Sequence, residues 1–399
     1  MANVAKKKVN ISLGIERFLD GPANYVKPGE RLGLICNQAT VDRGFRSAAD
    51  LFFEVDDLNL TTLFGPQHGI RGDVQDNMVE TGHAKDPKTG LPVYSLYSET
   101  REPSEEMLRD LDTLVFDLQD IGGRVYTFIY TMAFAMKACA NFGKRFVVLD
   151  RPNPINGKNV EGDMLEKGHE SFVGQFPIPM RHGMTVGELA SMFNKSFGID
   201  CELEVVPMSG WNRQLYLDET DVPWVMPSPN MPTVDTAMVF PGTVYLEGTE
   251  VSEGRGTTKP FEMIGAPYIE PEAFADHLNS LGLPGVYFRA TVFMPSFQKF
   301  AGEPCGGVFL HVTDRDSFRP VITGIAIIKV IIENFGEEFQ WKQGAYEYEF
   351  DRNPFDVIAG NESLRDHLET GSDLQVIEDS WSKDEEEFER IRSEYLIYE

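Results

Sequence analysis

The sequence has few cysteines and no long apolar run. Its 399 residues include four cysteines, and none of them forms a CxxC pair. Cysteines this far apart predict small buried side chains in a reducing compartment, and they exclude a disulfide framework and a typical zinc site. No apolar run reaches the roughly 18 residues of a transmembrane helix, so we predict no membrane span. The cysteines are Cys36, Cys139, Cys201 and Cys305.

Positive charge is also scarce. The chain has 36 Lys and Arg against 63 Asp and Glu, a formal net charge of −27. This balance argues against nucleic acid and anionic membrane as partners, because both require a basic face. The first ten residues contain a run of lysines with no apolar core behind it, which does not predict a signal peptide. We therefore expect a cytoplasmic protein from the sequence as written, and an exported mature form if the chain was trimmed.

Several catalytic and cofactor motifs are missing. Neither Gly122-Gly123 nor Gly254-Arg-Gly256 fits GxGxxG or the P-loop, which argues against a dinucleotide cofactor. The GxSxG of a serine hydrolase and the HExxH of a zinc protease are absent too. His68 and His182 lie in different loops, so a metal site would need distant ligands to converge. We predict no cofactor and no metal, and keep a metal-dependent hydrolase as an alternative.

Buried strands alternate with helical segments through the first half of the chain. This alternation predicts a mostly parallel sheet with helices on both faces, in a first domain of residues 1–240. Shorter strands and an apolar helix then predict a smaller α+β domain of residues 241–399. The predicted strands of the first domain are 31–38, 58–64, 93–96, 114–116, 145–150 and 202–207.

Uncommon polar residues follow four of these strands. Ligands of open α/β sheets bind outside the carboxyl ends of the strands, so we expect these side chains to share one edge. They are Asn37, then Gln67 and His68, then Asp117 and Asp120, then Asp150, Arg151 and Asn153.

Arginines in Gly/Pro-rich loops indicate an anionic ligand, since the guanidinium group binds carboxylate or phosphate in bidentate fashion. These are Arg71, Arg124, Arg151, Arg181 and Arg255. Paired carboxylates suit glycoside hydrolysis, in which one protonates the leaving oxygen and the other attacks or activates water. The candidates are Asp117, Asp120, Glu161, Glu247 and Glu253, and Tyr126 is one of the aromatic residues that could stack on a sugar ring. The simpler interpretation of the residue 117–126 turn is a buried Asp–Arg pair that braces it.

Seven motifs in order, from about residue 10 to the end, resemble the bacterial NamZ-type exo-β-N-acetylmuramidases, a YbbC-like family formerly classed as a domain of unknown function. They include Phe64-Gly-Pro-Gln-His-Gly-Ile-Arg-Gly, Phe116-Asp-Leu-Gln-Asp-Ile-Gly-Gly-Arg-Val-Tyr, Leu149-Asp-Arg-Pro-Asn-Pro and Glu247-Gly-Thr-Glu-Val-Ser-Glu-Gly-Arg-Gly-Thr. The resemblance implies that residues 1–240 form a Rossmann-like catalytic domain and that the smaller domain, residues 241–399, closes a cleft in which the site lies. It also implies release of terminal N-acetylmuramic acid from the non-reducing end of peptidoglycan fragments, without a cofactor. The substrate would be a muropeptide or a MurNAc-GlcNAc fragment, whose lactyl carboxylate is the expected anion.

The resemblance also suggests roles for the candidate residues. Asp120 and Glu253, then Asp117 and Glu247, are the predicted reacting carboxylates, and His68 would orient or polarise the substrate. The predicted substrate-binding residues are Asn37, Gln67, Arg71, Arg124, Tyr126, Arg151, Asn153, His182, Asn230 and Arg255.

Position 67 departs from the family pattern, which usually has glutamate there. If that glutamate is the acid or base, the amide of Gln67 cannot replace it. The alternative is therefore a catalytically lapsed or altered protein that still binds muro-sugars.

Overall fold

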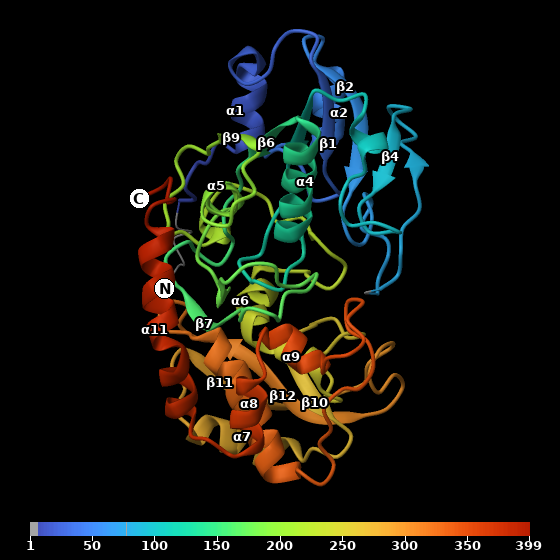
Figure 1. The fold of residues 1–399 in the computed structure, drawn as a ribbon. Coiled ribbons are helices and arrows are strands. Elements are labelled where there is room, and N and C mark those ends of the chain that lie inside the picture. The colour runs from blue at the N-terminus through green and yellow to red at the C-terminus, as the bar shows by residue number, and fades with distance from the viewer. Residues whose placement is uncertain (1–6, 77) are drawn as a thin grey trace.

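The computed structural model describes residues 7–76 and 78–399 and contains a large sheet followed by a smaller one (Figure 1). Residues 1–6, which belong to the segment where the sequence predicts no signal peptide, lie outside the described part. In the described residues, no helix combines the length and apolar character needed to cross a membrane. The four cysteines are buried and free, as the sequence predicts.

The larger sheet has seven strands in the order β3-β4-β2-β1-β5-β6-β9, and all neighbours are parallel except β3 and β4. The predicted Rossmann-like, mostly parallel sheet is therefore confirmed. The strand order reverses between β1 and β5, which is where open α/β sheets form a ligand crevice. The strands are β1 (Arg31–Ile35), β2 (Asn59–Gly65), β3 (Ala84–Lys85), β4 (Pro92–Ser95), β5 (Thr113–Phe116), β6 (Arg145–Leu149) and β9 (Glu202–Val206).

Alternating residues of these strands pack into two separate cores. Leu114 and Phe116 of β5 face one core, which includes α4 and α5, whereas Val115 faces the other, which includes α1 and α2. Helices on both faces explain why the strands are apolar throughout. The capping box predicted at Thr185 and Glu188 begins α5. The helices are α1 (Gly14–Asp20), α2 (Ala48–Glu54), α3 (Glu105–Leu108), α4 (Phe128–Phe142) and α5 (Val186–Lys195).

The smaller sheet is antiparallel, in the order β10-β12-β11, and lies at the other end of the molecule (Figure 1). Helix α6 and the 3-10 helix η3 lead into it, and a short hairpin of β7 and β8 lies beside α11. These elements are β7 (Glu161–Met164), β8 (Pro179–Arg181), α6 (Val234–Thr243), η3 (Val244–Gly248), β10 (Met263–Ala266), α7 (Pro271–Ser280), β11 (Val286–Phe293), β12 (Cys305–Val312), α8 (Pro320–Phe335), α9 (Pro354–Ala359), α10 (Ser363–Glu369) and α11 (Leu374–Arg392). Two further 3-10 helices are η1 (Pro22–Asn24) and η2 (Leu217–Glu219).

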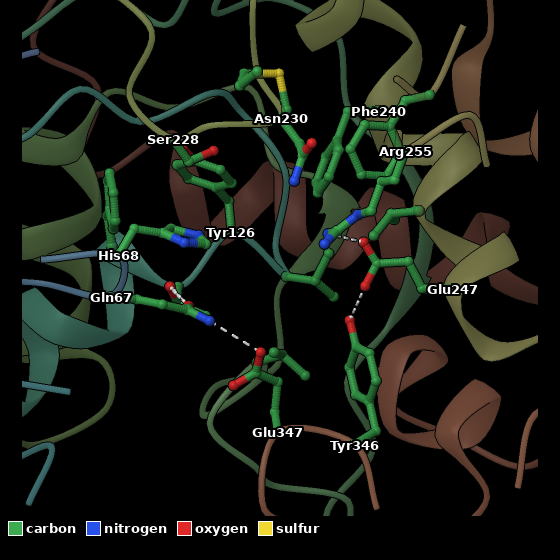
Figure 2. Close-up of a pocket in the computed structure, with 17 residues that line it drawn as sticks. Gln67, His68, Tyr126, Ser228, Asn230, Phe240, Glu247, Arg255, Tyr346 and Glu347 are labelled. Atoms are coloured by element: carbon green, nitrogen blue, oxygen red, sulfur yellow. Dashed lines mark hydrogen bonds and ion pairs between the residues drawn. The ribbon is translucent and has the colours of Figure 1, made fainter. Parts of the chain in front are cut away.

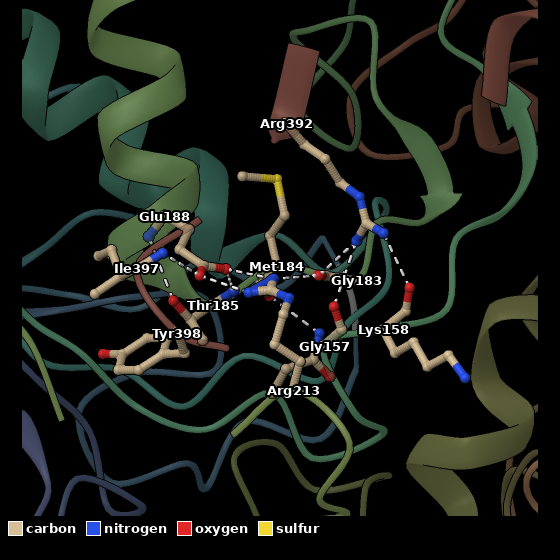
Figure 3. Close-up of polar contacts among 12 residues, drawn as sticks. Gly157, Lys158, Gly183, Met184, Thr185, Glu188, Arg213, Arg392, Ile397 and Tyr398 are labelled. Carbon is tan, nitrogen blue, oxygen red and sulfur yellow. Dashed lines mark hydrogen bonds and ion pairs between the residues drawn. The ribbon is translucent and has the colours of Figure 1, made fainter. Parts of the chain in front are cut away.

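The last helix ties the smaller domain back to the larger one (Figures 1 and 3). Arg392 at the end of α11 donates to the carbonyl oxygens of Gly157, Lys158 and Gly183 at 3.4, 3.0 and 3.0 Å. Beyond the helix, the backbone N–H of Ile397 donates to Glu188 at 2.8 Å. These contacts fix how the two domains sit against each other, and therefore fix the cleft between them.

We expect Arg392→Met to lower the free energy of unfolding by about 3 kcal/mol, because three largely buried carbonyl groups lose charged donors. Urea unfolding measured by circular dichroism tests this. Arg390→Met on the same helix is the matched control, because the exposed Arg390–Glu387 pair contributes little. Equal stability of the two variants would contradict the anchoring role of Arg392.

Candidate active site

A pocket lies between the carboxyl edge of the larger sheet and the smaller domain (Figure 2). Gln67 and His68 follow β2, Tyr126 and Thr127 lie between β5 and α4, and Phe128 begins α4. The rest of its lining comes from α6, η3 and later loops, so both domains build it. The lining residues are Gln67, His68, Val125, Tyr126, Thr127, Phe128, Val173, Ser228, Asn230, Met231, Phe240, Val244, Glu247, Arg255, Phe261, Tyr346 and Glu347.

Glu247 is the carboxylate on the η3 side of the pocket. It is buried, accepts hydrogen bonds from Arg255 and, at 2.7 Å, from the hydroxyl of Tyr346. Arg255 also lies 3.5 Å from Glu253, which in turn pairs with Lys299 at 2.8 Å. These two cations lower the pKa of Glu253 against the opposing effect of its burial. Alternating charges therefore surround Glu247, and Arg255 compensates its negative charge.

Glu347 is the second carboxylate of the pocket, and among the described residues its side-chain hydrogen-bond donors are neutral. The hydroxyl of Tyr97 donates to one of its oxygens at 2.6 Å, and the side-chain amide of Gln67 donates to the other at 3.0 Å. The Gln67 oxygen accepts from Thr127 at 2.6 Å, which fixes the orientation of that amide. Burial raises the pKa of Glu347, and the nearby charge of Glu247 raises it further.

His68 faces the same pocket from the sheet edge (Figure 2). Its Nδ1 lies 2.8 Å from the carbonyl oxygen of Val74, which can only accept, so Nδ1 carries the hydrogen and Nε2 is free to accept. Burial lowers the pKa of His68 to about 4, and the charge of Arg255 acts in the same direction. The imidazole is therefore neutral at neutral pH and suits hydrogen bonding to a ligand.

Aromatic rings form the wall between these polar groups. Tyr126 packs edge-on against Phe240, with ring centroids 6.0 Å apart, and Phe240 packs edge-on against Phe261 at 4.9 Å. Asn230 lies beside Phe240 in Figure 2 and accepts a hydrogen bond from Gln75 at 3.0 Å. An apolar wall with few directed polar groups is typical of a pocket for a small ligand.

The structure brings six of the predicted site residues into this pocket. They are Gln67, His68, Tyr126, Asn230, Glu247 and Arg255. Glu253 lines a neighbouring pocket that shares the walls formed by Glu247, Arg255, Tyr346 and Glu347. Their roles in the reaction stay predictions.

Asp117 and Arg151 lie outside the pocket and pair with each other. Both are buried, and a second guanidinium hydrogen bond of 2.9 Å makes the contact bidentate. Arg151 also donates to the carbonyl oxygen of Val41 at 3.0 Å. The pair therefore braces the ends of β5 and β6. The simpler interpretation above placed both members of the ion pair in the 117–126 turn, whereas Arg151 lies outside that turn.

Asp120 and Arg124 also stabilise the 117–126 turn. Asp120 accepts from the N–H of Gly122 at 2.8 Å and lies 3.3 Å from Nε2 of the fully buried His182. Arg124 donates to carbonyl oxygens of both domains, including Asp163 at 2.6 Å and Ile358 at 3.1 Å. Neither residue lines the pocket, so their placement favours structural roles.

The other predicted residues lie at the periphery. Asn37 donates to the carbonyl oxygen of Pro227 at 3.0 Å and so holds the loop that carries Asn230. Asn153 donates to the carbonyl oxygen of Met184 at 3.0 Å, and Arg71 is exposed beside a different pocket. Of the loop arginines named as ligand-binding residues, only Arg255 lines the main pocket.

Sequence reasoning missed Glu347 and Tyr346. They lie in the segment 345–350, where no glycine-rich loop or strand end marks a site. The available signal was the repeated pairing of tyrosine with glutamate, Tyr346-Glu347-Tyr348-Glu349.

Two carboxylates in one pocket with different neighbours can perform acid/base work, because their environments separate their proton affinities. Within residues 7–76 and 78–399, no group of three or more His, Cys, Asp or Glu side chains is arranged to hold a metal ion. The chemistry that Glu247 and Glu347 support is proton transfer assisted by charge.

Comparison with known proteins gives consistent matches over nearly the whole chain. Residues 32–235 match the family model for the N-terminal domain of the exo-β-N-acetylmuramidase NamZ, and residues 238–398 match its C-terminal domain. The chain is 49% identical over 396 residues to the peptidoglycan β-N-acetylmuramidase NamZ of Bacillus subtilis (strain 168), covering 99% of this chain and 93% of that protein.

Two solved structures of DUF1343 family proteins from Bacteroides fragilis NCTC 9343 are also similar. One has a TM-score of 0.89 at 37% identity and covers 98% of this chain and 100% of its own. The other has a TM-score of 0.75 at 29% identity and covers 98% and 99%.

Proposed function

The chain belongs to the NamZ family of exo-β-N-acetylmuramidases, and from this premise we propose that it is a glycosidase that releases terminal N-acetylmuramic acid from the non-reducing end of peptidoglycan fragments. The observation that carries the proposal is the pair Glu247 and Glu347 on one pocket. Glycosidases of the retaining and inverting classes both use two carboxyl groups beside the scissile bond.

The neighbouring pocket supports a substrate that carries a carboxylate. Lys299 and Arg255 contribute positive charge there, but both already pair with glutamates. Lys342 lines the same pocket, and no carboxylate of the described residues lies within 4.0 Å of its ammonium group. A lactyl carboxylate distinguishes N-acetylmuramic acid from N-acetylglucosamine, so Lys342 is suited to recognise that difference.

The direct test compares two chromogenic substrates, the β-N-acetylmuramide and the β-N-acetylglucosaminide with the same leaving group. We expect release from the muramide alone. Equal release from both would contradict recognition of the lactyl group. No release from either, with N-acetylmuramic acid still bound in calorimetry, would favour the alternative of a lapsed sugar-binding protein.

The alternative of a lapsed sugar-binding protein rests on the amide at position 67. The contacts of Gln67 favour an active enzyme instead. The amide holds Glu347, so the pocket keeps two carboxylates although residue 67 is not one of them.

We expect Gln67→Glu to stay active and to shift the basic limb of its pH–rate profile to higher pH. Two carboxyl groups in contact cannot both ionise, so the pair retains a proton to higher pH. The measurement is kcat/KM against pH on the muramide, with the exposed Gln343→Glu as a control of equal charge. Hydrolysis that appears only in Gln67→Glu would show that the wild-type protein has lapsed.

A further inference from the structure

The turn that carries Glu347 has an unusual backbone. Tyr346 and Glu349 exchange backbone hydrogen bonds of 3.0 and 2.9 Å, which closes a two-residue turn around Glu347 and Tyr348. Both central residues have positive φ, 46° at Glu347 and 69° at Tyr348. Asn and Gly normally occupy such turns, because a larger side chain with positive φ costs about 1–2 kcal/mol. The surrounding contacts must therefore hold the turn in place.

This conformation places two consecutive side chains in the pocket. Tyr346 contacts the carboxylate of Glu247, and Glu347 is the second carboxylate. The hydroxyl of Tyr346 donates to Glu247 at 2.7 Å, whereas Glu347 itself accepts from Gln67 (Figure 2). Glu347 also accepts from Tyr97. A turn near the C-terminus thus reaches across to the end of β2, 280 residues earlier in the chain. Strain that is retained where side chains converge on a pocket indicates a functional constraint.

We propose that Glu347 is the proton donor of the reaction and that Gln67 and Tyr97 are positioning residues for it. This inference rests on the proposed function and assigns the acid role within it. Tyr97 and Gln67 each occupy one lone pair of a different Glu347 oxygen, so a further lone pair on either oxygen can carry the proton. Gln67 holds one Glu347 oxygen as a neutral donor.

The proton transfer accompanies cleavage of the glycosidic bond. Glu347 gives its proton to the glycosidic oxygen as the bond from that oxygen to C1 of muramic acid breaks, and the electron pair of that bond stays on the oxygen. Water supplies the oxygen that replaces it at C1, and the proton that the water loses restores neutral Glu347 by way of solvent or directly. Glu247, whose charge Arg255 compensates, is then the carboxylate that attacks C1 or activates that water.

The groups facing Glu347 set the pH at which it loses that proton. Tyr97 and Gln67 favour its ionised form, as does Arg255, whereas Glu247 opposes it. The phenol of Tyr346, which bonds Glu247, stays protonated because burial raises its pKa. Burial has the largest effect, so the pKa of Glu347 is higher than that of an exposed glutamate.

The test uses Glu347→Gln with two substrates that differ in their leaving group. The disaccharide MurNAc-GlcNAc needs protonation of its leaving oxygen, whereas the leaving group of the 4-nitrophenyl muramide departs as a stable phenolate. We expect kcat/KM to fall about 10³-fold for the disaccharide and less than about 10-fold for the aryl glycoside. The control is Glu349→Gln in the same turn, whose carboxylate pairs with Arg352 outside the pocket. It should leave both rates unchanged.

Equal losses on both substrates would overturn the proton-donor role of Glu347 while leaving the glycosidase function intact. A wild-type protein inactive on both would overturn the proposed function and this inference with it. Tyr97→Phe provides a second test that keeps every carboxyl group. Loss of its hydrogen bond disfavours ionised Glu347, so the basic limb of kcat/KM should move to higher pH. An unchanged basic limb would also contradict the assignment.

Discussion

Glu247→Gln is expected to reduce kcat about 10⁴-fold on the 4-nitrophenyl muramide and on the disaccharide alike. This prediction follows from the proposal that the carboxylate of Glu247 attacks C1 or activates the water that does, because an amide can do neither. Both reactions need this step whatever the leaving group is. Similar losses on both substrates would therefore distinguish the role of Glu247 from that of Glu347, because Glu347→Gln should change the rate on the aryl substrate much less.

The matched control for this experiment is Glu250→Gln, which removes a partly exposed carboxylate from the same segment. Glu247→Gln should remain folded, because Arg255 keeps Glu253 as a charged neighbour at 3.5 Å. Thermal unfolding of each variant checks this. Activity of Glu247→Gln within 10-fold of the wild type would exclude Glu247 as a reacting group. The anomer first released by the wild-type enzyme, measured by proton NMR, then distinguishes attack on C1 from activation of water.

The fold of the larger domain could be predicted because its signals are local. The apolar run Leu114 to Phe116 is long enough for one buried strand, and the structure has β5 at Thr113–Phe116. The capping box at Thr185 and Glu188 similarly depends on residues three apart. Strand and helix signals of this kind need no knowledge of distant contacts.

The pocket could be predicted only in part, because its lining residues come from segments that are far apart in the sequence. Residues at the end of β2, such as Gln67 and His68, follow from the rule that sites lie at carboxyl ends of parallel strands. Glu347 meets Gln67 across 280 residues, and nothing local in its turn predicts that contact. The same rule also selected Asp117, because a buried ion pair and a reacting carboxylate look alike in sequence.

Asp117→Asn should destabilise the protein by about 3–5 kcal/mol, the second large effect that the structure predicts. Arg151 is 3% exposed, and its guanidinium would lose its only carboxylate partner among the described residues while remaining buried. Urea unfolding gives this loss directly. Asp110→Asn is the control, since Asp110 is 86% exposed and lies 3.7 Å from Arg31 at the surface. Its loss should cost less than about 0.5 kcal/mol.

A double variant separates bracing from chemistry at this position. Asp117→Leu with Arg151→Met removes both charges, so it should recover most of the stability that Asp117→Asn loses, because no unpaired charge stays buried. If Asp117 only braces the strand ends, the double variant should also regain most of the hydrolysis. A double variant that is stable yet inactive would instead support the prediction that Asp117 takes part in the reaction. Stability and kcat measured on the same preparations therefore decide between a buried ion pair and a reacting carboxylate.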